Sequence, residues 1–250
     1  MATIRLVRHA TLLIELAGTT FLVDPMLDPA GARPPIAGTP NERPNPLVGL
    51  PMAAADVVAA ADAVLVTHLH QDHLDETAVW LVREAGLPVL SQPGDGATLR
   101  ERGLADVTEV APEATHGGVA LHRTGGRHGH GELAAKMGQV SGFVLRAPRE
   151  PAVYVAGDTV WCDEVEAALT AHRPDVVVVN AGAATFTGAP PITMDAADLL
   201  RVADAAPDAL VVAVHLEAIN HCLEGREALR AAVDGRRVAV PDDGETVELR

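Results

Sequence analysis

The chain carries the heptapeptide Thr67-His68-Leu69-His70-Gln71-Asp72-His73 directly after the short apolar run Ala63–Val66. The length and β-branched content of that run favour a strand, and residues two apart at the end of an extended segment project to the same side. His68 and His70 can therefore hold one ion between them, whereas Asp72 and His73 face a displaced point as the chain turns into a helix. Three imidazoles and a carboxylate so close together suit zinc and, less selectively, manganese or iron.

Apolar runs and helical patterns alternate along the rest of the chain. The short apolar runs predict strands over residues 11–16, 20–23, 63–66, 119–122, 142–145, 152–156, 176–179, 210–214 and 237–240. Apolar residues at three- and four-residue intervals predict helices over 75–85, 94–102, 163–172, 195–205 and 225–233. The run 176–179 is apolar at every position, as in strands covered on both faces. We expect two sheets packed face to face with helices outside, dividing near residues 112–118, in one domain over residues 1–250.

A proline-rich segment separates the first predicted strands from the histidine loop. Residues 24–51 contain eight prolines, which exclude a regular helix or strand. A loop of this length within a compact domain is usually functional or disordered. We expect it to form a lid over a site.

The charge of the chain narrows the choice of partners. The formal net charge is −15, which repels nucleic acid and anionic membranes, so we expect a small-molecule substrate. No apolar run approaches the length of a membrane span, and charges interrupt residues 1–16, which makes a poor signal peptide. The two cysteines are too few for a disulfide framework. We expect a cytoplasmic protein without a membrane or nucleic-acid partner, and its oligomeric state, including a homo-oligomer, stays open.

The heptapeptide resembles the His-x-His-x-Asp-His signature of the metallo-β-lactamase superfamily, and further motifs appear in the order of that family. These motifs are Phe21-Leu22-Val23-Asp24, Gly126-Arg127-His128-Gly129, Ala156-Gly157-Asp158-Thr159 and Val214-His215. The opening segment from Arg8 to Glu15 is similar to the branch that contains ascorbate-6-phosphate lactonase. The resemblance covers nearly the whole chain and implies an α/β (α+β) fold, the four-layer αββα sandwich.

The resemblance also implies a ligand set for two zinc ions, with manganese or iron as alternatives. The set consists of His68, His70 and His128 for the first ion, Asp72, His73 and His215 for the second, and Asp158 as the bridge between them. In the same resemblance, Asp24 ends a strand and braces the metal loop by hydrogen bonds.

The third histidine of the first ion has several candidates, because His116, His122, His128 and His130 all lie in range. Glycines at positions 125, 126 and 129 let the backbone approach an ion, which favours His128 or His130. We predict His128 as the ligand, with His130 as the alternative.

The implied reaction is hydrolysis. A hydroxide shared by two metal ions attacks an ester, lactone or phosphoester bond of a small molecule. Asp72 is expected to orient this hydroxide and pass its proton to the leaving group. His221 is expected to contact the substrate or leaving group, or to support a ligand from behind.

Other functions compete with hydrolysis. The same ligand set suits a non-catalytic metal-binding or ligand-sensing protein, and a phosphodiesterase or nuclease is a further alternative. The acidic charge counts against a nuclease. A di-iron redox protein of this fold normally needs a flavin-bearing partner domain, for which 250 residues leave no room.

Several residues next to the motifs are further candidates for the site. His9 is expected to line it, and Trp161 is expected to form a pocket wall. Cys222 is interpreted as a small buried apolar residue. Asn180 and Gly182 follow an apolar strand, where pockets in layered folds collect residues. The local positive charges that can hold an anionic substrate are Arg8, Arg123 and Arg127.

Overall fold

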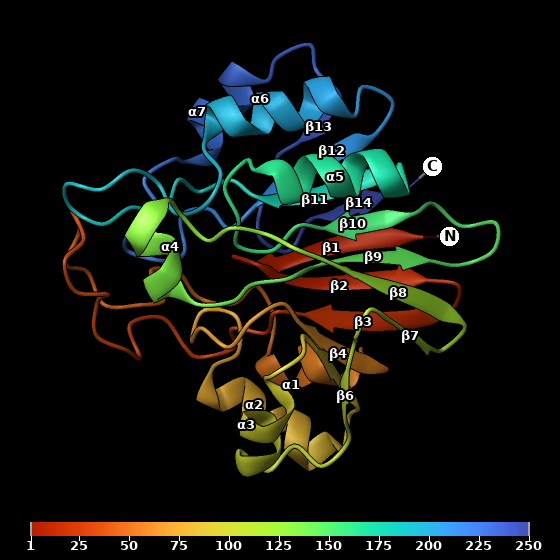
Figure 1. Ribbon diagram of the computed structural model, residues 1–250. Helices are drawn as coiled ribbons and strands as arrows, with labels where there is room; N and C mark the ends of the chain where they lie inside the picture. Colours follow the sequence, from red (N-terminus) through yellow and green to blue (C-terminus); the bar gives the residue numbers. More distant parts are fainter. Residues whose placement is uncertain (1, 250) are drawn as a thin grey trace.

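The computed structural model describes residues 2–249 and contains two seven-stranded sheets packed face to face (Figure 1). The first sheet runs in the order β14 (Thr246–Glu248), β1 (Thr3–Arg8), β2 (Thr11–Leu16), β3 (Thr19–Val23), β4 (Ala63–Val66), β5 (Val89–Ser91) and β6 (Val107–Glu109). The second runs in the order β13 (Val238–Ala239), β12 (Leu210–Val214), β11 (Val176–Asn180), β10 (Val153–Val155), β9 (Gly142–Arg146), β8 (Val119–Thr124) and β7 (Glu113–His116).

Both sheets share one topology. The first sheet is antiparallel from β14 to β3 and parallel from β3 to β6. The second is antiparallel from β7 to β10 and parallel from β10 to β13. Parallel neighbours need a crossover, usually a helix. The helices between them are α1 (Ala54–Ala59), α2 (Glu76–Ala85) and α3 (Gly96–Glu101) in the first half, and α5 (Asp163–His172), α6 (Ala196–Ala205) and α7 (Arg226–Ala232) in the second.

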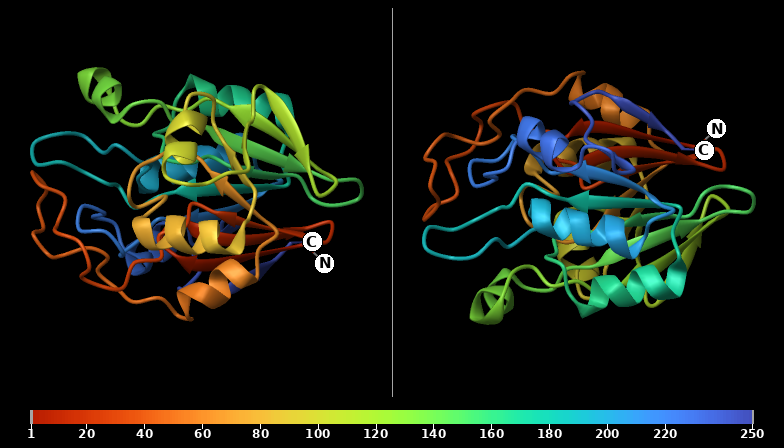
Figure 2. Two further views of the ribbon diagram at one scale, coloured as in Figure 1. Left: turned by 90° about the horizontal axis from the view of Figure 1, so that it is seen from below. Right: turned by 90° about the horizontal axis from the view of Figure 1, so that it is seen from above.

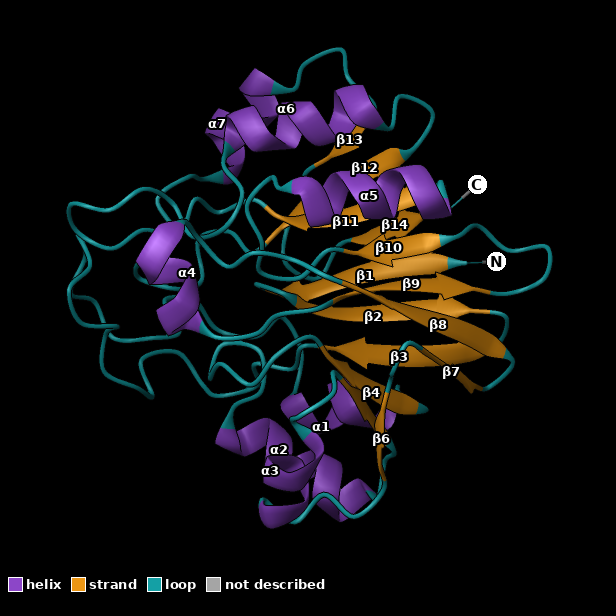
Figure 3. Ribbon diagram, in the orientation of Figure 1, coloured by secondary structure: helices purple, strands orange, loops and turns teal. Residues whose placement is uncertain are grey.

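Three apolar clusters hold the layers together. One fills the space between the sheets, a second lies under α1, α2 and α3, and a third lies under α5, α6 and α7. The run 176–179 in β11 is apolar at every position because both faces of the strand are covered. Val176 and Val178 enter the central cluster, whereas Val177 and Val179 enter the cluster under α5, α6 and α7. The layers follow the order helix, sheet, sheet and helix (Figure 2), and Figure 3 shows helices on both outer sides of the strands. The predicted four-layer sandwich is therefore confirmed.

Local signals set the ends of the predicted helices. The side chain of Asp75 accepts a hydrogen bond from the amide of Ala78 at the start of α2, and Gly86 ends that helix in the left-handed conformation. Asp195 caps α6 in the same way through the amide of Asp198. Within residues 2–249 no helix is long and apolar enough to cross a bilayer.

Some elements were missed by the sequence analysis. These are the strands β1, β5, β6, β7 and β14, and the helices α1 and α4 (Gly131–Met137). Most of them have too few residues to show a periodic pattern, and they form because neighbouring strands or helices complete them. The predicted division lies between β6 and β7, but β14 returns from the end of the chain to the first sheet.

The fold gathers strand ends at one edge of the sandwich, on the left in Figure 1. The carboxyl ends of β3, β4, β10, β11 and β12 all point towards this edge. The proline-rich segment 24–51 covers it and, as predicted, contains no helix or strand, only the isolated pairing of Arg33 with Asn45. Layered folds collect their pockets at such strand ends.

Candidate metal centre

The first group of candidate ligands comes from the loop after β4 and the segment before α4. The ligand atoms of His68, His70 and His128 all lie within 4.8 Å of one another. His128 donates its Nδ1–H to the carbonyl oxygen of Ile192 at 2.8 Å, so its Nε2 is presented to the group. Nδ1 of His68 lies 3.0 Å from the hydroxyl oxygen of Thr67, which turns its Nε2 towards the same point.

The structure separates the two candidates for the third histidine. His128 is buried within this group, whereas His130 is exposed at the start of α4. The glycine at 129 allows the turn between them because its φ is +101°, and a Cβ there would lie 2.9 Å from the side chain of Ile192. The geometry therefore favours His128 as the ligand.

The second group of candidate ligands is buried beside the first. It contains Asp72, His73 and His215, together with His9, and all their ligand atoms lie within 4.8 Å of one another. Nε2 of His9 donates to Oδ2 of Asp72 at 3.2 Å. His215 lies after β12 with a φ of 66°, and its Nδ1 is 3.4 Å from Sγ of Cys222, which leaves Nε2 facing the group.

Asp158 lies between the two groups, at the turn that follows β10. Its Oδ2 is 3.4 Å from Nε2 of His128 in the first group and 3.2 Å from Nε2 of His73 in the second. Its Oδ1 is 3.3 Å from Nε2 of His215 and accepts a hydrogen bond of 2.6 Å from Nδ2 of Asn180. One carboxylate thus reaches nitrogen atoms of both groups.

Asp24 supports the groups from behind. Its carboxylate accepts hydrogen bonds from the amide and the hydroxyl of Thr67 and from Nδ1 of His73, each at 2.8 Å. These bonds fix the loop after β4 to the end of β3 and turn Nε2 of His73 towards the centre. This is the bracing position that the sequence predicted.

Unpartnered buried atoms test whether cations fit here. Nε2 of His73 and Nε2 of His215 are buried and form no hydrogen bond, although both face Asp158. An unsatisfied buried polar group costs about 1–3 kcal/mol. Imidazole nitrogens and carboxylates are the donors that zinc and its neighbours accept. The residues therefore fit divalent cations, one at each group.

The ionisation of the cluster agrees with this fit. Burial raises the pKa of Asp158, but His215 and His73 outweigh it and hold that pKa well below its usual range. Burial also raises the pKa of Asp72, and His73, His215 and His9 outweigh it in the same way. Both carboxylates are therefore anionic. Burial lowers the pKa of His68 well below its usual range, so this ring is neutral, as a metal ligand must be.

His73 and His215 show the opposite shift. Burial lowers the pKa of each ring, but nearby negative charges, with Asp158 the largest contributor, outweigh it and raise the pKa well above its usual range. The carboxylates therefore favour a positive charge at both rings. A cation that binds here supplies that charge in place of protons.

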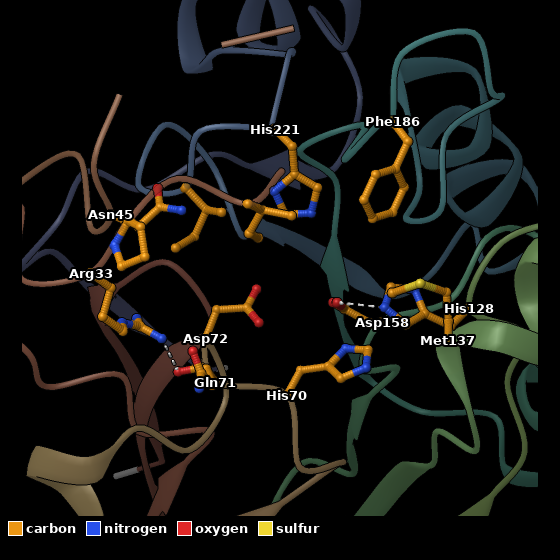
Figure 4. Close-up of a pocket in the computed structure, with 13 residues that line it drawn as sticks. Arg33, Asn45, His70, Gln71, Asp72, His128, Met137, Asp158, Phe186 and His221 are labelled. Atoms are coloured by element: carbon orange, nitrogen blue, oxygen red, sulfur yellow. Dashed lines mark hydrogen bonds and ion pairs between the residues drawn. The ribbon is translucent and has the colours of Figure 1, made fainter. Parts of the chain in front are cut away.

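A cavity of about 250 Å³ opens over the cluster (Figure 4). Its polar floor contains His70, Asp72, His128 and Asp158. The other lining residues are Arg33, Pro34, Ile36, Asn45, Gln71, Met137, Phe186, Ile219 and His221. His221 faces the cavity from the side opposite His70 in Figure 4, and burial lowers its pKa to about 4, so its ring is neutral.

Several neighbouring predictions can now be placed. His9 is fully buried in the second group, and Asn180 contacts Asp158, so both belong to the centre. Gly182 is needed for close packing, because a Cβ there would lie 2.1 Å from the carbonyl oxygen of His215. Cys222 is half-buried rather than buried, and it contacts the ring of His215.

Other predictions were wrong. Trp161 packs against the apolar cluster under α5 and α6 and does not line the cavity. Arg8 is buried and donates to the carbonyl oxygens of Met26 and Asp28, because a guanidinium can hold several turns of a loop at once.

The other two predicted anion-binding arginines also have partners away from the cavity over the cluster. Arg127 is exposed and pairs with Glu164, and Arg123 donates to the hydroxyl of Ser141. Arg33 is the arginine that lines the cavity, with Nε 3.0 Å from Asp28 and Nη1 donating to the carbonyl oxygen of Gln71.

The cavity wall was missed by the sequence analysis. Phe186, Ile36, Ile219 and Met137 come from loops and from α4, and no local pattern connects them. Ile36 lies in segment 24–51, and the proline content of that segment was the one signal that placed it over the site.

Comparisons with known proteins identify the family of this chain. A family model described as beta-lactamase superfamily domain matches residues 19–216. The UPF0173 protein YddR of Bacillus subtilis (strain 168) is 35% identical over 246 residues, which cover 96% of this chain and 97% of that protein.

Two solved structures are similar over nearly their whole length. A possible metal-dependent hydrolase from Veillonella parvula DSM 2008 has a TM-score of 0.95 and 36% identity, with 99% of each chain covered. An isothiocyanate hydrolase from Delia radicum gut bacteria has a TM-score of 0.91 and 35% identity, with 98% of each chain covered. The chain therefore belongs to the beta-lactamase superfamily, and its relatives include proteins named metal-dependent hydrolases.

Proposed function

We propose that this protein is a hydrolase of small molecules that works with two divalent cations, with zinc as the first candidate metal. The observation that carries the proposal is the position of Asp158, whose two oxygens face imidazole nitrogens of both ligand groups. In this proposal His68, His70 and His128 would hold one cation, Asp72, His73 and His215 would hold the other, and Asp158 would serve both.

The cations and the chain have separate tasks. When bound, divalent cations lower the pKa of water to about 7 and so supply a nucleophile and a Lewis acid at neutral pH. Asp72 accepts the Nε2–H of His9 at Oδ2, and in this proposal its carboxylate orients the attacking water and takes up the water's proton. His221 is neutral at pH 7 and offers an N–H to the substrate oxygen on which charge develops. Hydrogen bonds to Asp24 and to the carbonyl oxygen of Ile192 fix the tautomers of His73 and His128, so these two rings are ordered before substrate binds.

The cavity wall narrows the substrate. Its sides are largely apolar, and the single arginine among the lining residues is already held by Asp28 and Gln71. A phosphorylated sugar would need several free cationic donors. Arg33 is the one arginine among the described residues of this wall; its Nη2 has no hydrogen-bond partner, but Asp28 already balances its charge. We therefore propose that the substrate is a small, largely apolar and uncharged molecule with an ester or lactone bond.

A second candidate substrate is an isothiocyanate. The similar isothiocyanate hydrolase covers nearly all of this chain, and an apolar isothiocyanate suits an apolar wall with a polar floor. The central carbon of this group is electrophilic and accepts hydroxide, as an ester carbonyl does. The same residues would serve both reactions.

The test measures metal content and turnover on the same sample. Protein purified without chelator is analysed by mass spectrometry, and is then assayed on esters, lactones, phosphodiesters and aryl isothiocyanates. We expect two cations per chain and turnover that chelator removes and added zinc restores. Two cations without turnover on any of these substrates would favour a metal-binding or ligand-sensing protein instead.

A further inference from the structure

Asn220, which directly precedes His221, makes an unusual number of contacts for one side chain. It is 1% exposed. Its Oδ1 accepts from the amide of Ile36 at 3.1 Å and from Nδ2 of Asn45 at 2.7 Å. Its Nδ2 contacts the carbonyl oxygen of Ile36 and the hydroxyl of Thr39, at 3.2 and 2.6 Å, and the carbonyl oxygen of Asn41.

All of these partners lie in residues 33–45, which we call the wall segment. Nothing in this segment forms a helix or a strand, apart from the pairing of Arg33 with Asn45 at its two ends. The backbone of Asn220 adds another bond, because its amide donates to Oδ1 of Asn45 at 2.8 Å. Within the described residues, the hydrogen bonds that join residues 36–41 to the chain outside the wall segment end on Asn220, apart from one in which the amide of Thr187 donates to the carbonyl oxygen of Gly38.

The wall segment supplies part of the cavity. Ile36 and Asn45 line it, and His221 lines it from the neighbouring loop (Figure 4). His221 is also tied in place, because its carbonyl oxygen accepts from the amide of Thr185 at 2.9 Å. Asn220 therefore lies where the wall segment meets the loop that carries His221.

We infer that Asn220 is a positioning residue that fixes the wall segment against His221, so that the substrate pocket is preformed. The wall segment is then a rigid wall that sets substrate affinity, not the closing lid that its proline content suggested. The inference rests on the proposed function only for its effect on turnover. The effect on the wall segment itself is independent of any activity.

The chemistry of the side chain explains the choice of residue. A primary amide both accepts and donates, and Asn220 uses both capacities towards backbone and side-chain partners of opposite kinds. A carboxylate would keep the acceptor contacts but would face the carbonyl oxygens of Ile36 and Asn41 without a hydrogen to offer. An alanine would remove all of these side-chain bonds and leave the amide of Ile36 and Nδ2 of Asn45 without a partner.

The test compares Asn220→Ala with Arg43→Ala, an exposed change in the same segment. Hydrogen exchange at residues 33–45 is followed by mass spectrometry on the metal-loaded protein, together with metal content, KM and kcat. For Asn220→Ala we expect exchange in this segment to accelerate and KM to rise about tenfold, with metal content unchanged and kcat changed much less. Arg43→Ala should match the wild type.

Other results would overturn the inference. Unchanged exchange in residues 33–45 of Asn220→Ala would do so, whether or not a substrate has been found. A fall in kcat with loss of metal and unchanged KM would do so too, because Asn220 would then act through the metal centre. If Asn220→Ala does not fold, Asn45→Ala removes two of the bonds from the other side and is judged by hydrogen exchange in residues 33–45 alone, because Asn45 also lines the cavity. If the wild type turns over no substrate, the proposed function fails while the exchange measurement still decides the role of Asn220.

Discussion

The two halves of the molecule share a topology but use equivalent positions differently. β3 and β10 are both the last antiparallel and first parallel strand of their sheets, and each leads into a buried aspartate, Asp24 in the first half and Asp158 in the second. The neighbouring strands β4 and β11 lead to Thr67 and Asn180. The next strands, β5 and β12, lead to Gln92 and His215.

The difference lies in the hydrogen bonds that each aspartate receives. The carboxylate of Asp24 accepts hydrogen bonds from the amide and hydroxyl of Thr67 and from His73. These bonds brace the loop after β4. Asp158 accepts one hydrogen bond from Asn180 and otherwise faces imidazole nitrogens. An aspartate at this strand end thus either braces a loop or is a candidate metal ligand. Which role it has depends on how many hydrogen bonds the adjacent strand and loop donate to its carboxylate.

The largest expected effect follows from removing the carboxylate of the second half. In Asp158→Ala, turnover should fall by about 10³-fold or more, because both cations lose a shared anionic ligand. The fold should persist, since Asp158 is not part of the apolar clusters. Turnover is measured beside circular dichroism and metal content, with His70→Ala as a parallel variant. Full activity in a metal-loaded sample of either variant would contradict the ligand assignment.

Removing the brace of the first half should cost both stability and activity. Asp24→Ala leaves Thr67 and His73 with unpaired buried donors. We expect the free energy of unfolding to fall by about 3 kcal/mol and turnover by about 10–100-fold. Urea unfolding of the metal-free protein separates the first effect from the second. A purely catalytic loss with unchanged unfolding would show that Asp24 does not brace the loop.

A smaller effect is expected at the residue that orients Asp158. Asn180→Ala removes the single hydrogen bond that this carboxylate accepts from an amide side chain. Metal affinity or kcat should fall by about tenfold, as for other partners of metal ligands, while KM changes little. Metal titration and steady-state kinetics measure this split. A change in KM alone would place Asn180 in the substrate pocket instead.

The smallest effect is expected at Gln92, the counterpart of His215. The side-chain amide of Gln92 donates to the carbonyl oxygen of Gln139 and accepts from the hydroxyl of Ser141. These two bonds join the halves of the molecule away from the metal-ligand cluster. Gln92→Ala should lower the free energy of unfolding by about 1 kcal/mol and leave turnover almost unchanged. His215→Ala, assayed in parallel, should lose most of its turnover. Equal losses in both variants would mean that the two positions are not used differently.

The comparison also shows how far the sequence alone could lead. The candidate ligands could be named because histidine and aspartate follow apolar strands at short spacings, and local alternation predicts which strands end there. The superfamily follows from the same motifs, whereas the lactonase-like branch and the choice of zinc stay predictions. His9 and Asn180 could only be suspected, because their roles depend on contacts with Asp72 and Asp158 from distant segments.

Local chemistry by itself determined the donor types of the centre, the strands and helices with clear periodicity, and the irregular course of residues 24–51. Only the tertiary structure decided that His128 and not His130 faces the cluster, and that Arg33 lines the cavity while Trp161 does not. It also decided that Asn220 holds the wall segment. The reason is that periodicity and spacing act over a few residues, whereas a contact between loops depends on how two sheets pack and where their strands end.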